Sequence, residues 1–211
     1  MKSPEPTPEH PPTDALAGAV RGDAGGDAGG DDARRFGEAW ARVTPAVYAW
    51  ASLHVRPPLR VRLDPEDILQ EVAFRAWTRF DTWDAERGSF RNWVFGIARH
   101  VLHETLRRMA VEALSRGGDL LTTHRMEALP DTATAVTRGV ARDEGLLRLV
   151  GEVQSLPDED RRLLLLRGLE GLSHAEVATV LQMTPDAVAK RWQRLCERLR
   201  SRPRWAELVV A

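Results

Sequence analysis

The chain has 211 residues, of which 43% are hydrophobic and 29% are charged, so it can form one large domain or two small ones around an apolar core. No stretch reaches the roughly 18 consecutive apolar residues of a membrane span, and the N-terminus lacks the basic-then-apolar order of a signal peptide. The single cysteine, Cys196, excludes an internal disulfide and a multi-cysteine zinc site. We therefore expect a cytoplasmic protein with no cofactor and no membrane contact of its own.

Charge is distributed unevenly, although the net charge is only −1. Residues 1–35 hold 4 basic and 7 acidic residues. Five Arg and one acid lie between Arg87 and Arg108, and seven basic residues and two acids lie between Thr184 and Arg204. Local basic stripes of this kind are typical of surfaces that contact phosphate. Charge alone favours the simpler interpretation, which is a solvated helix face.

The N-terminal part of the chain predicts a tail followed by a helix. Residues 1–33 combine a proline-rich stretch with GDAGGDAGGDD, which cannot bury enough apolar surface to order the chain, so we predict a disordered tail. From about 35 to 56, apolar residues recur at helical spacing: Phe36, Trp40, Val43, Val47 and Trp50. Pro45 interrupts the pattern and predicts a kink or two shorter helices.

The next helix is predicted at 65–80, because Asp64 is a good N-cap and Pro65 suits the first helical position. The stripe expected to be buried consists of Ile68, Leu69, Val72, Ala76 and Phe80. The opposite stripe, expected to be exposed and without a partner in its own helix, consists of Asp67, Gln70, Glu71 and Phe74.

A loop at 81–89 leads into a long helix predicted at 90–109, with Ser89 as its N-cap. The side expected to be buried carries Phe90, Val94, Ile97 and Val101. The other side carries Asn92, Gly96, Arg99, His103 and Arg107, with His100 at its edge. Two histidines three residues apart could bind a metal, but no cysteine or carboxylate converges on them, so we favour exposed or DNA-facing histidines.

Residues 112–133 predict a linker, because apolar periodicity lapses there and Gly, Thr and Pro are frequent. A helix is predicted from 134 to 154, and another begins after Pro157 with DEDRRLLLLRGLE. No strand pattern and no internal repeat is found in the sequence. The chain is therefore predicted to be all-α, with two small helical domains joined by a flexible linker.

The last segment has the pattern of a helix-turn-helix. Ser173 and Glu176 form a capping box, a turn follows at 182–183, and Thr184 caps a second helix that runs to about 201. The buried side of this second helix is predicted to hold Val188, Trp192, Leu195 and Leu199. Its outer side holds Asp186, Lys190, Gln193, Arg194 and Glu197, flanked by Arg191 and Arg198.

A second helix that is apolar behind and polar-basic in front is typical of a recognition helix in the DNA major groove. Lys190 and Arg194 suit base acceptors, and Gln193 suits adenine. Arg191 and Arg198 suit phosphates. The alternative is a plain helical hairpin within a bundle.

Two blocks resemble the extracytoplasmic-function group of the sigma-70 family. The first, DPEDILQEVAFRAWTRFDTWDAERGSFRNWVFGIARHVLHETLRR at 64–108, resembles the family's region 2. The second, LPDEDRRLLLLRGLEGLSHAEVATVLQMTPDAVAKRWQRLCERLR at 156–200, resembles region 4 and contains G-L-S-x-x-E-V-A. Their order, with an unpatterned linker between them, strengthens the assignment, and the resemblance spans about 34–201.

The resemblance implies a subunit that gives bacterial RNA polymerase its promoter specificity and catalyses no reaction itself. Its partners would be the polymerase core, at the β′ clamp and the β flap, and promoter DNA, while an anti-sigma partner is left open. The implied domains are a tail at 1–33, a region 2 domain at 34–111, a linker at 112–133, a region 4 domain at 134–202 and a tail at 203–211.

The resemblance also implies three sets of contact residues. The set for the polymerase core is Asp67, Gln70, Glu71 and Phe74. The set for the −10 element is Trp83, Arg87, Asn92, Arg99, His103 and Arg107. The set for the −35 duplex is Asp186, Lys190, Arg191, Gln193, Arg194 and Arg198. The side of the 90–109 helix that carries Asn92 and Arg99 suits melted, single-stranded DNA, and Trp83 either stacks on a flipped base or packs under its own loop.

The sequence departs from the family at the start of the recognition helix, where D-A-V-A-K-R at 186–191 replaces the common G-T-V-K-S-R, so the −35 sequence is not inferred from relatives. No G-x-S-x-G, phosphate-binding loop or paired carboxylates support an enzyme. Cys196 is interpreted as structural instead of a redox sensor. The rival interpretations are a repressor or activator that uses only the second block, and a helical partner-binding protein.

Overall fold

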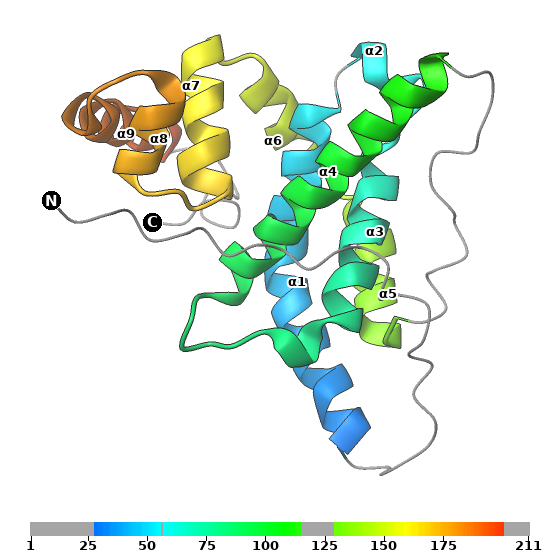
Figure 1. The fold of residues 1–211 in the computed structure, drawn as a ribbon. Coiled ribbons are helices and arrows are strands. Elements are labelled where there is room, and N and C mark those ends of the chain that lie inside the picture. The colour runs from blue at the N-terminus through cyan, green and yellow to red at the C-terminus, as the bar shows by residue number, and fades with distance from the viewer. Residues whose placement is uncertain (1–27, 56, 115–128, 201–211) are drawn as a thin grey trace, which may run out of the picture.

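The structure is a computed structural model that describes residues 28–55, 57–114 and 129–200. The regular elements of these residues are all helical, which confirms the all-α prediction. In order they are α1 (Ala28–His54), α2 (Pro57–Arg60), α3 (Pro65–Thr78), η2 (Phe80–Thr82), α4 (Phe90–Leu114), α5 (Asp131–Val140), α6 (Glu144–Gln154), α7 (Asp158–Leu163), η4 (Leu164–Leu169), α8 (His174–Leu181) and α9 (Pro185–Leu199) (Figure 1). None of the helices in the described ranges is long and apolar enough to cross a lipid bilayer.

Helix α1 is one continuous helix from Ala28 to His54 with Pro45 inside it, so the alternative of two shorter helices is wrong, and residues 28–33 belong to the helix instead of the tail. Arg34 pairs with Asp31 at 2.6 Å and with Glu38 at 3.1 Å, and such pairs stabilise the first turns of a helix. The carbonyl that Pro45 leaves without an intrahelical donor belongs to Ala41, which is an exposed residue. The remainder of the predicted N-terminal tail and the predicted tail at 203–211 lie outside the described residues.

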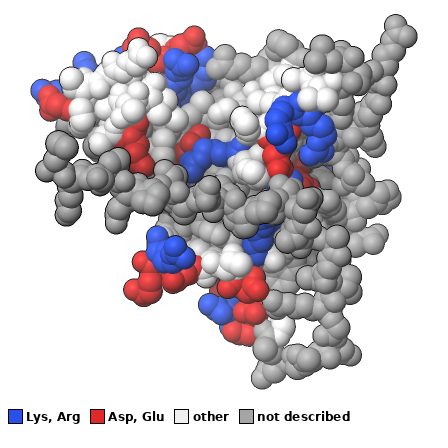
Figure 2. Space-filling model, in the orientation of Figure 1, with Lys and Arg blue, Asp and Glu red and all other residues white. Residues whose placement is uncertain are grey.

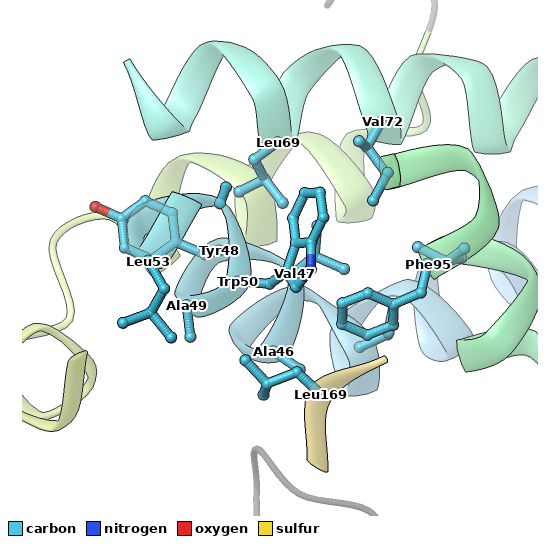
Figure 3. Close-up of a cluster of buried hydrophobic side chains, with 14 of the residues drawn as sticks. Ala46, Val47, Tyr48, Ala49, Trp50, Leu53, Leu69, Val72, Phe95 and Leu169 are labelled. Atoms are coloured by element: carbon cyan, nitrogen blue, oxygen red, sulfur yellow. The ribbon is translucent and has the colours of Figure 1, made fainter. Parts of the chain in front are cut away.

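Helix α1 is the central helix, because it packs against α3, α4, α5, α6 and η4. Its predicted apolar stripe is confirmed, with no member more than 3% exposed. Figure 3 shows Val47 and Trp50 of α1 in one cluster with Leu69 of α3, Phe95 of α4 and Leu169 of η4. The N-terminal and C-terminal helices therefore share a hydrophobic core.

Helices α3 and α4 begin at the positions predicted from their N-cap residues. The Asp64 carboxylate accepts the N–H of Glu66 at 2.8 Å, and the Ser89 hydroxyl accepts the N–H of Asn92 at 3.2 Å. The predicted buried stripe is confirmed, with exposure of 8% or less at every member, although α3 ends at Thr78 and Phe80 lies in η2. Helix α4 continues to Leu114, beyond the predicted end near Met109 and into the segment expected to be linker.

The single helix predicted at 134–154 is wrong, because two helices occupy this stretch. The Asp143 carboxylate accepts the N–H groups of Gly145 and Leu146 at 3.0 and 3.1 Å, and this N-cap starts α6 afresh. Helix α5 packs against α1 and α3 (Figure 1). The indole Nε1 of Trp40 donates to Thr137 Oγ1 at 3.0 Å across this contact. The predicted domain boundaries stay a prediction, and α5 lies with the N-terminal helices.

The C-terminal helices follow the predicted pattern closely. The Ser173 hydroxyl accepts the N–H of Glu176 at 3.2 Å, and the Glu176 carboxylate accepts the N–H of Ser173 at 2.7 Å, which confirms the capping box. Gln182 adopts a left-handed conformation with φ 55° in the turn. The Thr184 hydroxyl then accepts the N–H of Ala187 at 3.2 Å and starts α9. These features confirm the helix-turn-helix.

Candidate nucleic-acid interface

The predicted core-binding stripe on α3 is less exposed than expected. Its member Glu71 is 9% exposed, and the other three members are half-buried. The Glu71 carboxylate accepts Nε of Arg75 at 2.7 Å, and Nη1 of Arg75 donates to Glu104 of α4 at 2.7 Å. The expectation that Glu71 is exposed and has no partner in its own helix is therefore wrong.

The three charged groups of this network fix α3 against α4. Their side chains are only 10–16% exposed, so each charge depends on its partners for stabilisation. Burial alone would raise the pKa of the Glu104 carboxyl, but the hydrogen bond and charge of Arg75 outweigh it, and the pKa lies below its ordinary value. Burial likewise opposes the charge of Arg75, but the two carboxylates raise its pKa.

The polar side of α4 is exposed as predicted. Its exposed members are Asn92, Arg99, His103 and Arg107. His100 at the edge is half-buried, with Nε2 lying 3.0 Å from the Glu104 carboxylate. Among the described residues, no group of three or more potential ligands could hold a metal ion. On the face drawn in Figure 2, the described basic side chains lie in several separate groups with acidic side chains nearby.

The loop before α4 holds Trp83 under it. The half-buried Trp83 ring lies 5.9 Å from the Phe80 ring and 5.3 Å from the Phe90 ring, measured between centroids. Its indole Nε1 donates to the Gly88 carbonyl at 3.2 Å. In the described conformation Trp83 thus packs under its own loop, which is the second of the two expected roles, while Arg87 is exposed.

The outer side of α9 is exposed as predicted. Its members Asp186, Lys190, Gln193 and Arg194 face solvent. Nζ of Lys190 lies 2.8 Å from the Asp186 carboxylate. The apolar side is buried, including Trp192 at 8% exposure, so the predicted amphipathic helix is confirmed. Helix α9 therefore presents cationic and amide groups in front while its apolar side packs against α7 and α8.

The two flanking arginines of α9 have carboxylate partners within the chain. Nε of Arg191 donates to Asp160 of α7 at 2.8 Å, and Arg191 also binds Glu159. Arg198 donates to the same Asp160, which is 6% exposed. Burial alone would raise the pKa of Asp160, but the hydrogen bonds from both arginines outweigh it and hold the pKa below its ordinary value. The role of Asp160 was not predictable from the sequence, because an acid in a first helical turn signals only a helix start.

Glu170 is a second residue whose role was not predicted from the sequence. It follows η4, a π-helical turn, and its N–H donates to the Leu165 carbonyl at 2.9 Å. The carboxylate is 5% exposed and accepts the indole Nε1 of Trp50 at 2.8 Å and Nη1 of Arg99 at 3.1 Å. The sequence offered one signal for this site, which is an acid within the apolar run LLLLRGLEGL. An acid in such a run is expected to be buried, and a buried carboxylate requires hydrogen-bond partners.

Arg91 binds the same C-terminal segment. Its guanidinium donates to the carbonyls of Gly168 and Leu169, each at 3.3 Å, and lies 5.2 Å from the Phe95 ring centroid. Burial lowers the pKa of Arg91 to about 10. The start of α4 and the end of η4 are therefore in direct contact.

Two family models match the chain. The model of Sigma-70 region 2 matches residues 40–110, and the model of Sigma-70, region 4 matches residues 146–199. The chain belongs to the sigma-70 family. The first match runs from α1 to α4 and the second from α6 to α9, in the order that the sequence analysis predicted.

Similar proteins place the chain in the extracytoplasmic-function group of the sigma-70 family. The ECF RNA polymerase sigma factor SigD of Mycobacterium tuberculosis is 25% identical over 180 residues, which cover 85% of this chain and 80% of SigD. The ECF RNA polymerase sigma factor SigW of Bacillus subtilis is 27% identical over 151 residues, which cover 67% of this chain and 76% of SigW. The probable sigma factor RfaY of Xanthomonas campestris is 31% identical over 130 residues, which cover 61% of this chain but only 31% of RfaY. No solved structure matches the chain significantly.

Proposed function

We propose that this sigma-70 protein binds RNA polymerase core and directs promoter-specific initiation. The observation that carries the proposal is the pair of exposed polar helix sides, one on α4 within the region 2 match and one on α9 within the region 4 match. Two separate DNA-binding surfaces suit a promoter that has two separate recognition elements. The protein contributes recognition and no catalysis of its own, and it acts where the polymerase and the chromosome lie, at the cytoplasmic nucleoid.

The polymerase would bind the stripe on α3 through the half-buried Asp67, Gln70 and Phe74. Glu71 supports this surface from within, because it pairs with Arg75, and Arg75 in turn pairs with Glu104 of α4. We assign this stripe to the β′ clamp and the region 4 helices to the β flap. An anti-sigma protein that competes for these surfaces fits the family.

The −10 element would be met by α4 and the loop before it, through Arg87, Asn92, Arg99, His103 and Arg107, while Trp83 supports the loop from beneath. The −35 duplex would be met by Asp186, Lys190, Gln193 and Arg194 in the major groove. We propose that Arg191 and Arg198 hold α9 on α7 through Asp160 and offer their remaining N–H groups to phosphates. In this arrangement Arg191 and Arg198 position α9, and the residues on its outer side contact the bases.

A gel shift with and without core polymerase tests the function. A sigma factor needs core to bind promoter DNA tightly, whereas a repressor binds the duplex alone. Asp67→Lys should weaken core binding with the fold intact, because exposed or half-exposed substitutions on a helix usually cost under about 0.5 kcal/mol. The matched control is Glu66→Lys, which makes the same charge change on the exposed neighbouring residue. Equal core affinity in both variants would refute the role of the stripe.

Substitutions on the two proposed DNA-binding surfaces should impair different steps of initiation. Lys190→Ala or Arg194→Ala should cost about 1–3 kcal/mol in −35 binding and relax specificity at one base pair. Asn92→Ala should instead spare −35 binding and slow open-complex formation, and a template with a pre-melted −10 bubble should restore part of the rate. Loss of −35 binding in the Asn92 variant would show that α4 is not the strand-opening helix.

A further inference from the structure

The polar side of α4 is partly occupied by the chain itself. Glu170 pairs with Arg99 at 3.1 Å, and the carbonyls of Gly168 and Leu169 accept Arg91 at 3.3 Å. A Cβ at Gly171 would lie 2.7 Å from the Asn92 carboxamide oxygen, so the backbone of the C-terminal segment lies directly over that side chain. Residues 168–171 therefore meet α4 at Arg91 and Asn92 in its first turn and at Arg99 two turns later.

The chemistry of this contact matches that of a nucleic-acid strand. A carboxylate on Arg99 takes the place that a phosphate would take, because guanidinium binds both groups through the same N–H donors. Backbone carbonyls at the end of η4 bring partial negative charge to Arg91. A strand cannot bind Arg99 through the same N–H that Glu170 already accepts.

The contact is also held by apolar packing. Leu169 is 1% exposed and lies in the cluster with Trp50 and Phe95 that Figure 3 shows. The indole N–H of Trp50 donates to the Glu170 carboxylate at 2.8 Å, which fixes the carboxylate between α1 and α4. Helix α6 also packs on α1, so the helices that depend on η4 for their hold on the N-terminal part are α7, α8 and α9. Glu170 supplies the buried polar contact of this segment, and we expect its loss to release those helices.

We propose that the chain free of polymerase is closed, with Glu170 latching the C-terminal helices onto the polar side of α4, and that this latch must open before α4 can bind a melted strand. The inference rests on the function proposed above for α4. It assigns to Glu170 a regulatory contact that is separate from promoter readout.

Closure is measured by the distance between two spin labels on the full chain. Val61 and Val180 are 86% and 59% exposed and lie on the N-terminal and C-terminal parts, so Val61→Cys and Val180→Cys can carry the labels in a Cys196→Ser background. The free chain should give one narrow distance distribution. Glu170→Ala should give a broad distribution, and Arg99→Glu combined with Glu170→Arg should restore part of the narrow one. A broad distribution in the unsubstituted chain, or no change in Glu170→Ala, would overturn the proposal.

Occlusion is measured with a short fluorescent single-stranded oligonucleotide of random sequence. Loss of two bonds to a carboxylate should open the latch by about tenfold or more, and the apparent affinity for the strand should rise by up to the same factor. Glu144→Ala is the matched control, because it removes an equal charge from an exposed site on α6, outside both proposed DNA-binding helices, and should leave the affinity nearly unchanged. An open Glu170→Ala chain without a gain over this control would overturn the proposal. Promoter-directed transcription with core, run in parallel, tests the proposed function separately from the latch.

Discussion

Asp160 should be the residue that holds α9 in place, and its substitution gives a quantitative test of the region 4 architecture. Its side chain is 9% exposed, and its carboxylate accepts Arg191 at 2.8 Å as well as Arg198. Replacement by alanine removes both acceptors at once. The two arginines then lose the group that holds α9 against α7.

The expected loss follows from the exposure of each partner. A hydrogen bond between charged groups contributes about 1.5–3 kcal/mol when it is buried. The Arg191 side chain is 27% exposed and that of Arg198 is 54% exposed, so the second bond is discounted for screening by solvent. We expect Asp160→Ala to destabilise α9 by about 2–3 kcal/mol, and Asp160→Asn, which keeps one acceptor, by about 1–2 kcal/mol.

Native-state hydrogen exchange of the α9 amides is the direct assay. A loss of about 2–3 kcal/mol should speed exchange of these amides roughly 30- to 150-fold. Glu159→Ala is the control, since this acid binds the same Arg191 but is 71% exposed, and it should cost under about 1 kcal/mol. Equal effects of the two substitutions would refute the view that burial of Asp160 makes the difference.

Three further predictions concern the N-terminal helices and pH. Gly37→Ala should lower the melting temperature, because its Cβ would lie 2.3 Å from a side-chain oxygen of α5, whereas Gly30→Ala, with nothing within 4 Å, should be neutral or stabilising. Arg75→Ala should cost about 3–5 kcal/mol in urea unfolding, because two carboxylates lose their buried partner, and a cost below about 1 kcal/mol would contradict the network. The pKa values of Glu104 and Asp160 lie below their ordinary values, so their stabilisation is complete above about pH 5 and is lost as the pH falls through the folded-state values. Urea unfolding from pH 7 to 3 should show this decline, and the Asp160→Asn chain should show a shallower one.

Local signals in the sequence predicted most helix starts correctly. Asp64 before Pro65, the Ser173 capping box and Thr184 act within one helical turn, so their effect can be read without knowing the rest of the fold. The break before α6 shows the limit, since Asp143 caps a new helix although apolar spacing appeared continuous.

Partners of charged residues were not predictable in the same way. Glu71 was expected to be exposed because helical spacing places it opposite the apolar stripe, but Arg75 and Glu104 enclose it. Glu104 is 29 residues from Arg75, and Glu170 is 120 residues from Trp50. Such pairs depend on which helices meet, and helical spacing specifies which side of a helix is apolar without specifying what covers it.

The π-helical turn of η4 makes the direction of Glu170 depend on the length of the chain before it. Each residue of an α-helix advances the direction of its side chain by about 100°, and a π turn holds one residue more than regular winding requires. Deletion of a single leucine from LLLL at 163–166 would allow regular α-helix and would rotate Glu170 by about 100° away from Trp50 and Arg99. Relatives that carry an acid at this position can be compared by the number of residues between the start of α7 and that acid. Where this number is the same as here, the carboxylate should reach α1, and where it is one residue smaller, the carboxylate should face elsewhere.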